Sequence, residues 1–373
     1  MKSIRNIWWV QIALIWLVLG CNQEDVDQQA KMPTNLEVTV EKLGKGSVKI
    51  TAQANNANFY KVNYGLPNLT PERMTGNAVV YAYTTPGSFV ITVQAHATET
   101  DFITATKTVE ITPAEVGIGV PTTGFVSPLT YAGYNLVWND EFASTSLSDD
   151  WVFELGDGCP GLCGWGNNEL QYYRRENIEL KDGYLFITAK QESFGNKNYT
   201  SSRIKTQGKK SFKYGRIDVR AVLPKGQGLW PAVWMLGDNI TTVNWPACGE
   251  IDIMEMVGGN ADGRDNTIHG TVHWDNNGSW ANYGGSIRKV SGIFKDDFHV
   301  FSIIWDEAKI VWLLDNVPFH EIDTRPVGLD EFREPYFLLL NVAVGGNWPG
   351  SPNSTTSFPQ QMVVDYVRVF QKN

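Results

Sequence analysis

Apolar and polar residues alternate along most of the chain, and no long segment keeps the 3.6-residue period of an amphipathic helix. Between 32 and 113 the alternating runs are short, as in Leu36–Val40 and Phe89–Val93, and residues typical of turns separate them. From Tyr134 onward the runs are longer and richer in aromatic residues, as in Gly215–Arg220 and Val363–Val369. The pattern therefore predicts strands throughout and an all-β chain.

Tryptophan usage divides this chain into two differently built parts. Three of the 14 tryptophans lie within the first 16 residues, and none lies between Lys31 and Asn135. The short, evenly spaced strands before Pro113 favour a small β-sandwich similar to immunoglobulin-like or polycystic-kidney-disease (PKD) modules. We interpret this module as a spacer, with weak glycan binding as the alternative. The roughly 240 residues that follow are typical of a double-sheet jelly-roll β-sandwich with a concave face.

The N-terminus has the pattern of an export signal. Lys2 and Arg5 precede the apolar stretch Ile7–Leu19, which is too short to span a bilayer comfortably. The stretch ends in Leu19-Gly20-Cys21, which resembles the lipobox of a bacterial lipoprotein; an ordinary secretory signal is the alternative. The acidic run at 22–27 is similar to the signal that places Bacteroidetes lipoproteins on the outer face of the outer membrane. We therefore predict acylation of Cys21, which anchors the protein to the outer membrane at the cell surface.

These patterns together predict five consecutive segments. They are a lipoprotein signal peptide (1–20), an acidic tether (21–32), an immunoglobulin-like or PKD-like module (33–115), a linker (116–130) and a jelly-roll catalytic domain (131–373).

Charge and cysteine usage narrow the ligands that the chain can bind. The formal net charge is −9 without clusters of Lys and Arg, which disfavours nucleic acid and favours a neutral ligand. Beyond Cys21 the cysteines are Cys159, Cys163 and Cys248, and three cannot all pair within one chain. Cys159 and Cys163 are spaced for a small disulfide loop or for part of a zinc site. Because further zinc ligands are not evident, we favour the disulfide.

The candidate chemistry is concentrated in the segment Glu250–Met256. On a regular strand Glu250 and Asp252 share a face, whereas Glu255 points the opposite way. One extra residue in a β-bulge near Ile253 and Met254 brings Glu255 to the same face. Crowded carboxyl groups raise the pKa of at least one of them, and retaining glycoside hydrolysis needs one protonated and one ionised carboxyl. An acidic edge strand that resists aggregation is the alternative.

The same segment and several others resemble glycoside hydrolase family 16, in particular its laminarinase-like members. Glu250-Ile251-Asp252-Ile253-Met254-Glu255 matches the family's bulged signature Glu-x-Asp-x-x-Glu in full. The other matching blocks, in family order, are Trp138–Phe142, Asn167–Tyr173, Tyr214–Arg216, Gly228–Met235 and His269–His273. The resemblance implies a retaining, endo-acting hydrolase of β-1,3-glucan that needs no cofactor for catalysis and acts as a monomer. It also implies that Glu250 is the nucleophile, Glu255 the general acid/base, and Asp252 the residue that tunes the nucleophile.

Further residues are predicted to bind substrate. Flat indole rings offer apolar platforms to sugar rings, and polar side chains orient the hydroxyl groups. The candidates are Trp230, Trp234, Trp245, His273, Asn168, Arg203, Asn347 and Trp348. The tryptophans could instead pack in the core, and His269, which shares the parity of His273, could be structural.

The resemblance also implies a structural calcium ion on the convex side of the sandwich. The matching positions are Glu141, Gly183 and Asp365. Calcium prefers six to eight oxygen ligands, including main-chain carbonyl groups, so a glycine can contribute. The alternative is that Asp365 pairs with a base such as Arg368.

Two other kinds of function remain compatible with the sequence. One is a non-catalytic, surface glycan-binding lipoprotein, and the other is an adhesion or structural protein. Within the enzyme class, mixed-linkage glucan and red-algal galactans are alternative substrates. Sulfated galactans require a basic cleft, and Lys and Arg are not enriched around Glu250–Glu255.

Overall fold

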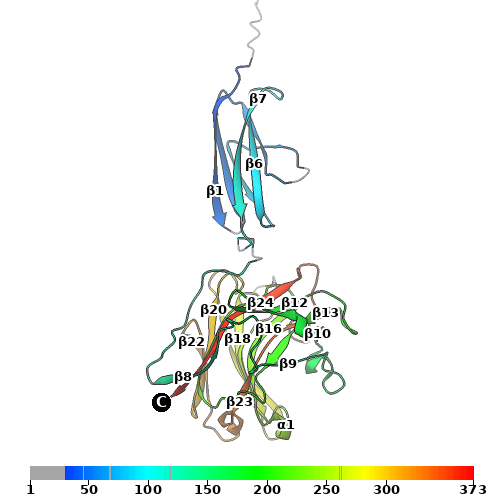
Figure 1. Ribbon diagram of the computed structural model, residues 1–373, viewed down its shortest axis with the longest axis vertical. Coiled ribbons are helices and arrows are strands. Elements are labelled where there is room, and N and C mark those ends of the chain that lie inside the picture. Colours follow the sequence, from blue (N-terminus) through cyan, green and yellow to red (C-terminus); the bar gives the residue numbers. More distant parts are fainter. Residues whose placement is uncertain are drawn as a thin grey trace, which may run out of the picture. The chain divides into compact units, whose positions relative to one another are not determined.

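The computed structural model describes residues 30–44, 46–66, 69–113, 115–116, 119–259, 261 and 263–373. The predicted signal peptide, Cys21 and nearly all of the acidic tether lie outside the described residues. The contacts divide the chain into two compact units, one ending at Ile111 and one beginning at Thr112 (Figure 1). Both units are built from strands, and the α-helix of the described part is a single turn, α1 (Ile240–Val243). Among the described residues, no helix is long and apolar enough to cross a membrane.

The first unit is a small sandwich of two antiparallel sheets. One sheet has the order β1-β2-β5 and the other β4-β3-β6-β7. Alternate residues such as Val48, Ile50, Ile91 and Val93 face the space between the sheets and are fully buried. The strands are β1 (Thr34–Gly44), β2 (Ser47–Asn55), β3 (Phe59–Asn63), β4 (Glu72–Arg73), β5 (Ala78–Ala82), β6 (Gly87–His96) and β7 (Phe102–Ile111).

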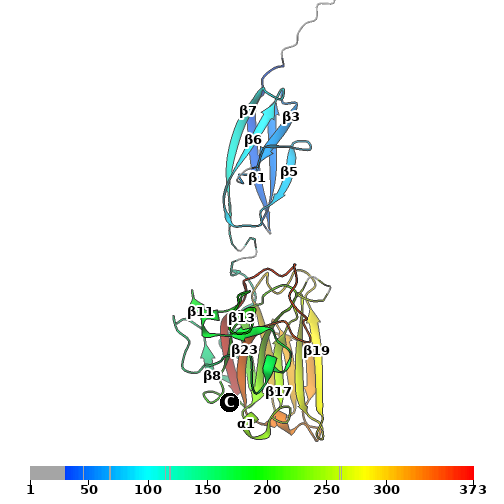
Figure 2. The same ribbon diagram turned by 90° about the vertical axis from the view of Figure 1, so that its right-hand side faces the viewer.

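The second unit is a jelly-roll sandwich of two large sheets packed face to face (Figures 1 and 2). The first sheet has eight strands in the order β11-β12-β24-β15-β20-β21-β22, with β8 also paired to β24. Its strands are β8 (Tyr134–Asp140), β11 (Ile178–Lys181), β12 (Tyr184–Ala189), β15 (Gly215–Val222), β20 (His299–Trp305), β21 (Lys309–Leu314), β22 (Val317–Asp323) and β24 (Gln360–Lys372).

The second sheet has seven strands in the order β19-β18-β17-β16-β23-β14-β9. They are β9 (Val152–Glu154), β14 (Arg203–Lys205), β16 (Leu229–Gly237), β17 (Glu250–Glu255), β18 (Thr267–Asp275), β19 (Trp280–Arg288) and β23 (Tyr336–Val344). A parallel pair, β10 (Gln171–Tyr173) and β13 (Tyr199–Ser201), and the 3-10 turns η1 (Cys163–Gly166), η2 (Arg175–Asn177) and η3 (Asp330–Arg333) complete the unit.

Apolar side chains from both sheets fill the space between them. Val233 and Met235 on β16, Ile251 on β17 and Leu340 on β23 are fully buried there. Burying such a side chain stabilises the folded state by about 1.5–3 kcal/mol, which fixes the face that each strand turns toward the core. The intervening residues of the strand then lie on the opposite face. The alternation of β16 and β17 therefore turns their polar and tryptophan residues outward, onto the exposed face of the seven-stranded sheet.

Residues 123–130, predicted to be part of a linker, are bound to the second unit. The backbone N–H of Phe125 donates to the carbonyl of Phe298 at 3.0 Å. Arg220 donates to the carbonyl of Phe125 at 2.6 Å, and Arg368 donates to the carbonyl of Ser127 at 3.0 Å. We call this segment the strap. The guanidinium groups could not be foreseen as its partners because they lie roughly 95 to 240 residues further along the chain.

Cys159 and Cys163 form a disulfide, as favoured from their spacing. Cys248, in the turn before β17, is a free thiol that is buried against Leu236 of β16 and against Phe337 and Leu339 of β23. Burial raises the pKa of this thiol to about 11.

Candidate active site

A bulge in β17 brings the three acidic side chains to one face of the seven-stranded sheet. Asp252 lies opposite Trp234 of β16, whereas Met254 lies opposite the adjacent Val233, so Ile253 is the extra residue. Glu255 then lies opposite Ala232, on the same face as Asp252. The bulge predicted near Ile253 and Met254 is therefore present.

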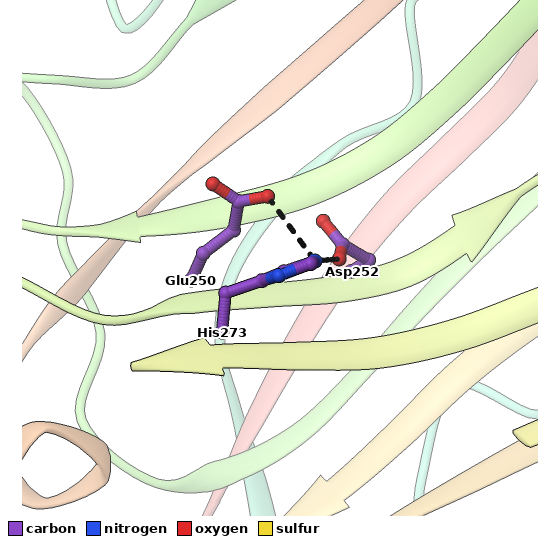
Figure 3. Close-up of side chains that lie close together, drawn as sticks. All are labelled: Glu250, Asp252 and His273. Carbon is purple, nitrogen blue, oxygen red and sulfur yellow. Dashed lines mark ion pairs between the residues drawn. The ribbon is translucent and has the colours of Figure 1, made fainter. Parts of the chain in front are cut away.

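His273 lies beside two of these carboxyl groups. It is opposite Glu250 in the register of β17 with β18. Its Nε2 is 3.1 Å from Oδ2 of Asp252 and 3.8 Å from Oε1 of Glu250. Figure 3 shows the imidazole ring reaching from β18 toward both carboxyl groups on the neighbouring strand. The side chain of Asp252 is only 3% exposed, so this group is almost entirely removed from water.

Burial raises the pKa of all three carboxyl groups. The pKa of Glu250 rises to about 8, through burial first and the neighbouring charge of Asp252 second. Burial raises the pKa of Asp252 to about 7. The pKa of Glu255 lies well above its usual range because of burial and the charges of Asp252 and Glu250. A site of this kind retains at least one proton near neutral pH, as general acid catalysis requires.

Two predicted tryptophans each bind one of the outer carboxyl groups. Trp230 Nε1 donates to Oε1 of Glu255 at 2.9 Å, and Trp245 Nε1 donates to Oε2 of Glu250 at 2.9 Å. An indole N–H only donates, so both contacts favour the ionised carboxylate and oppose the effect of burial on the pKa. Trp245 is also 46% exposed, which leaves ring surface free for a ligand.

Trp234 and Arg203 lie on the same face but largely bind other protein groups. Trp234 Nε1 donates to Oδ1 of the buried Asn341 at 2.7 Å. The guanidinium of Arg203 lies between the rings of Trp234 and Trp165, 4.6 and 4.9 Å from their centroids. Its Nε is 2.6 Å from Oε2 of Glu154. This arrangement holds Arg203 in place. Its partner Glu154 also binds Lys205 at 2.5 Å, so one carboxylate is shared by two cations.

The remaining candidates gather near the Glu255 end of the cluster. Asn168 donates to Oδ1 of Asn347 at 2.8 Å, and both side chains are exposed. Trp348 packs edge-on against Trp230 at 5.7 Å and against His269 at 4.9 Å. Because Asn168 and Asn347 are 179 residues apart in the chain, their contact joins two loops at this end of the face.

Sequence reasoning missed Trp280, which lies beside His273 at the Glu250 end. Trp280 Nε1 donates to Nδ1 of His273 at 3.0 Å, and the indole is 57% exposed. The signal for it was the sequence Asp275-Asn276-Asn277-Gly278-Ser279-Trp280. Asn-Gly between alternating runs predicts a two-residue hairpin turn, which would have placed Trp280 opposite Asp275 on the face of His273.

The carboxyl groups predicted to hold calcium bind arginine residues. Both oxygens of Glu141 accept from Arg368 at 2.8 Å, and Oδ2 of Asp365 accepts from Arg220 at 2.7 Å. The alternative, that Asp365 pairs with a base, is therefore confirmed, although the base is Arg220 and not Arg368. Gly183 lies in the turn between β11 and β12 with a positive φ of 81°, and its carbonyl group is the kind of ligand that calcium accepts. Calcium binding would have to compete with two ion pairs.

Glu250, Asp252 and His273 are the described residues whose ligand atoms converge closely enough to hold a metal ion, all within 4.8 Å of one another. Two carboxylates and an imidazole suit a divalent cation. The same three groups, however, lie close enough to share protons, so their arrangement equally suits acid–base chemistry.

The comparisons with known proteins agree with this geometry. The family model of glycosyl hydrolases family 16 matches residues 163–368, which is more than half of the chain. The chain is 42% identical over 241 residues to the clotting factor G alpha subunit of Tachypleus tridentatus, covering 64% of this chain and 34% of that protein. It is 38% identical over 282 residues to the glucan endo-1,3-beta-glucosidase A1 of Niallia circulans, covering 69% of this chain and 40% of that protein. The chain thus spans less than half the length of these two curated relatives.

A solved structure gives the same result for the second unit. The laminarinase catalytic domain from Thermotoga maritima MSB8, in complex with cetyltrimethylammonium bromide, superposes with a TM-score of 0.60. The two chains are 43% identical, and the match covers 64% of this chain and 99% of that domain.

Proposed function

Because this chain belongs to glycosyl hydrolases family 16, we propose that it is a retaining, endo-acting hydrolase of β-1,3-glucan of the laminarin type. The observation that carries the proposal is the bulge of β17, which puts Glu250, Asp252 and Glu255 on one open face. The names of the relatives support a β-1,3-glucan as substrate.

In the proposed mechanism the two outer carboxyl groups have different tasks. Glu255, whose pKa burial raises furthest, protonates the departing glycosidic oxygen. Glu250 attacks the anomeric carbon and forms a glycosyl-enzyme ester, and Glu255 then removes a proton from the water that hydrolyses it. Asp252 lies between them on the same strand. Its charge and its contact with His273 govern how readily Glu250 gives up its proton.

The charges on the face favour a neutral polysaccharide. Arg203 lies on this face, and Glu154, which also binds Lys205, offsets part of its charge at 2.6 Å. A sulfated galactan would bring anionic groups close to three carboxyl groups, which is unfavourable. The partly exposed indole rings of Trp245 and Trp348 instead suit the C–H faces of neutral glucose rings.

The test is the loss of Glu250 together with the stereochemistry of the reaction. We expect Glu250→Gln to lower the rate of laminarin hydrolysis by several orders of magnitude. The variant should keep its fold and its binding of glucan. The control is Glu179→Gln, a change of an exposed carboxyl on β11, which should leave turnover unchanged. NMR of fresh product from the wild-type protein should show the β-anomer first. Initial α-anomer, or full activity of Glu250→Gln, would refute the mechanism.

The substrate is tested separately with a panel of defined polysaccharides. We expect laminarin to release oligosaccharides of several lengths early in the reaction, as internal cleavage requires. Faster cleavage of mixed-linkage glucan or of a red-algal galactan would overturn the assignment of substrate while leaving the mechanism intact.

A further inference from the structure

A tight hairpin fixes Trp280 next to the candidate catalytic residues. Asn277 and Gly278, with φ of 55° and 84°, form the turn between β18 and β19. The backbone N–H of Gly278 donates to Oδ2 of Asp275 at 3.0 Å. Asp275 lies opposite Trp280, and His273 lies opposite Asn282, so the indole is the diagonal neighbour of His273 on the same face.

The contact between the two rings is a directed hydrogen bond. Trp280 Nε1 is 3.0 Å from Nδ1 of His273, and the ring planes differ by only 16°. The lone pair of an imidazole nitrogen lies in the plane of its ring, and nearly parallel ring planes are compatible with an N–H that points along that lone pair. Since an indole N–H only donates, Nδ1 of His273 must be the acceptor and carries no proton.

The state of Nδ1 determines what His273 presents to the carboxyl groups. A neutral imidazole with an accepting Nδ1 carries its proton on Nε2. This Nε2 faces Oδ2 of Asp252 at 3.1 Å and Oε1 of Glu250 at 3.8 Å (Figure 3). Oδ2 of Asp252 is buried and makes no well-formed hydrogen bond among the described residues, so Nε2 of His273, 3.1 Å away, is the group placed to donate to it.

We propose that Trp280 is a positioning residue that holds His273 in the Nε2–H tautomer, so that His273 donates toward Asp252. Asp252 then remains an acceptor on Oδ2, so a proton that it shares with Glu250 is carried on its other oxygen, Oδ1, and Glu250 can be ionised for attack. Trp280 thus acts on catalysis through two intermediate side chains. The kinetic part of this inference rests on the proposed function, whereas the tautomer does not.

The exposure of Trp280 argues against a purely structural role. The indole is 57% exposed, and its ring centroid lies 5.8 Å from that of His273 and 6.1 Å from that of Trp245. Trp245 binds Glu250 in the same way that Trp280 binds His273. The two tryptophans therefore orient two adjacent members of the same cluster.

The first experiment measures the tautomer in the full chain by ¹⁵N NMR of the imidazole groups. The protein contains five histidines, so single substitution of His273 assigns its signals. We expect an unprotonated Nδ1 and a protonated Nε2 in the wild-type protein, and averaged signals in Trp280→Phe. Tyr283→Phe is the matched control, because Tyr283 is an exposed aromatic residue of β19 whose side chain faces away from His273. An Nδ1–H or doubly protonated ring in the wild type, or an unchanged ring in Trp280→Phe, would overturn the proposal.

The second experiment separates positioning from substrate binding. Loss of one hydrogen bond should lower kcat of Trp280→Phe on laminarin by about threefold to tenfold, with KM changed by less than about twofold. A rise of KM at unchanged kcat would assign Trp280 to substrate binding and contradict a positioning role. If the protein does not hydrolyse glucan, the NMR result still decides the tautomer, so the two failures are distinguishable.

Discussion

Trp230 donates a 2.9 Å hydrogen bond to one oxygen of Glu255 and leaves the other oxygen to carry the proton. The bond stabilises the ionised form, so it lowers the pKa of Glu255, while burial and the neighbouring carboxyl groups raise it. Trp230 therefore limits how strongly the proposed general acid holds its proton.

Removing this donor should shift the pH dependence of the reaction. In Trp230→Phe the pKa of Glu255 should rise further, and the alkaline limb of kcat/KM, where the acid loses its proton, should move to higher pH. A full pH profile on laminarin measures this. Trp348→Phe is the control, since it replaces a neighbouring indole that makes no hydrogen bond to Glu255 among the described residues. An unmoved alkaline limb in Trp230→Phe, or an equal shift in the control, would contradict this role.

The raised pKa values also predict a dependence of stability on pH. Asp252, with its pKa near 7, and Glu250, with its pKa near 8, bind protons in the folded protein that the unfolded chain has already released at pH 5 to 7. The free energy of unfolding should therefore fall as the pH rises from 5 to 8.5. Asp252→Asn should reduce that fall by about 1 kcal/mol or more, measured by urea unfolding at both pH values. Parallel curves for the variant and the wild type would show that the buried carboxyl groups do not destabilise the fold.

Arg368 should contribute more to stability than a solvent-exposed ion pair. Its guanidinium is 8% exposed and joins Glu141 to the carbonyl of Ser127 in the strap. Arg368→Met should lower the free energy of unfolding by about 1–3 kcal/mol, because it leaves these acceptors unpaired. Arg325→Met, which breaks the exposed pair with Asp323, should cost less than about 1 kcal/mol. Equal effects in urea unfolding would show that Arg368 contributes no more to stability than an exposed ion pair.

Calcium remains a prediction from the family resemblance. A bound ion near Glu141, Gly183 and Asp365 would stabilise the folded state by mass action, so EDTA should lower the melting temperature. Thermal unfolding with EDTA, and again after excess calcium is restored, measures the effect. Identical curves together with the absence of metal in elemental analysis would exclude the ion and leave the arginine pairs as the cross-links of that region.

Anchoring through Cys21 is likewise a prediction from the sequence. Cys21→Ala should move the protein from the membrane fraction to the soluble fraction, and labelled fatty acid should be incorporated only when Cys21 is present. Protease treatment of intact cells should degrade the wild-type protein if it lies on the cell surface. Continued membrane association of Cys21→Ala would contradict lipid anchoring.

Local patterns predicted those parts of the site that lie on one strand. The alternation of β17, together with one extra residue, was sufficient to place Glu250, Asp252 and Glu255 on a common face. The parity of β18 placed His273 on that face as well. In each case the decisive information is the period of a single strand, which can be counted along the sequence.

Contacts between distant segments were not predictable in the same way. Asn341 binds Trp234, and Glu154 binds Arg203, because β9, β14, β16 and β23 lie in one sheet. The order of strands in a sheet does not follow from the period of any of them. The partner of Asp365 was mistaken for a related reason: Arg368 is near in sequence, but β24 pairs with β15, whose Arg220 makes the contact.

The disulfide between Cys159 and Cys163 leaves Cys248 as the free thiol of the described chain. Cys248 is fully buried, and burial raises the pKa of its thiol to about 11, so alkylating reagents near neutral pH meet neither an accessible nor an ionised sulfur. The sulfur becomes reactive when the turn that carries it separates from Leu236 of β16 and from Phe337 and Leu339 of β23. The rate of its chemical labelling therefore measures how often the sheet opens beside Glu250, and Cys248 is a natural probe of local unfolding next to the candidate active site.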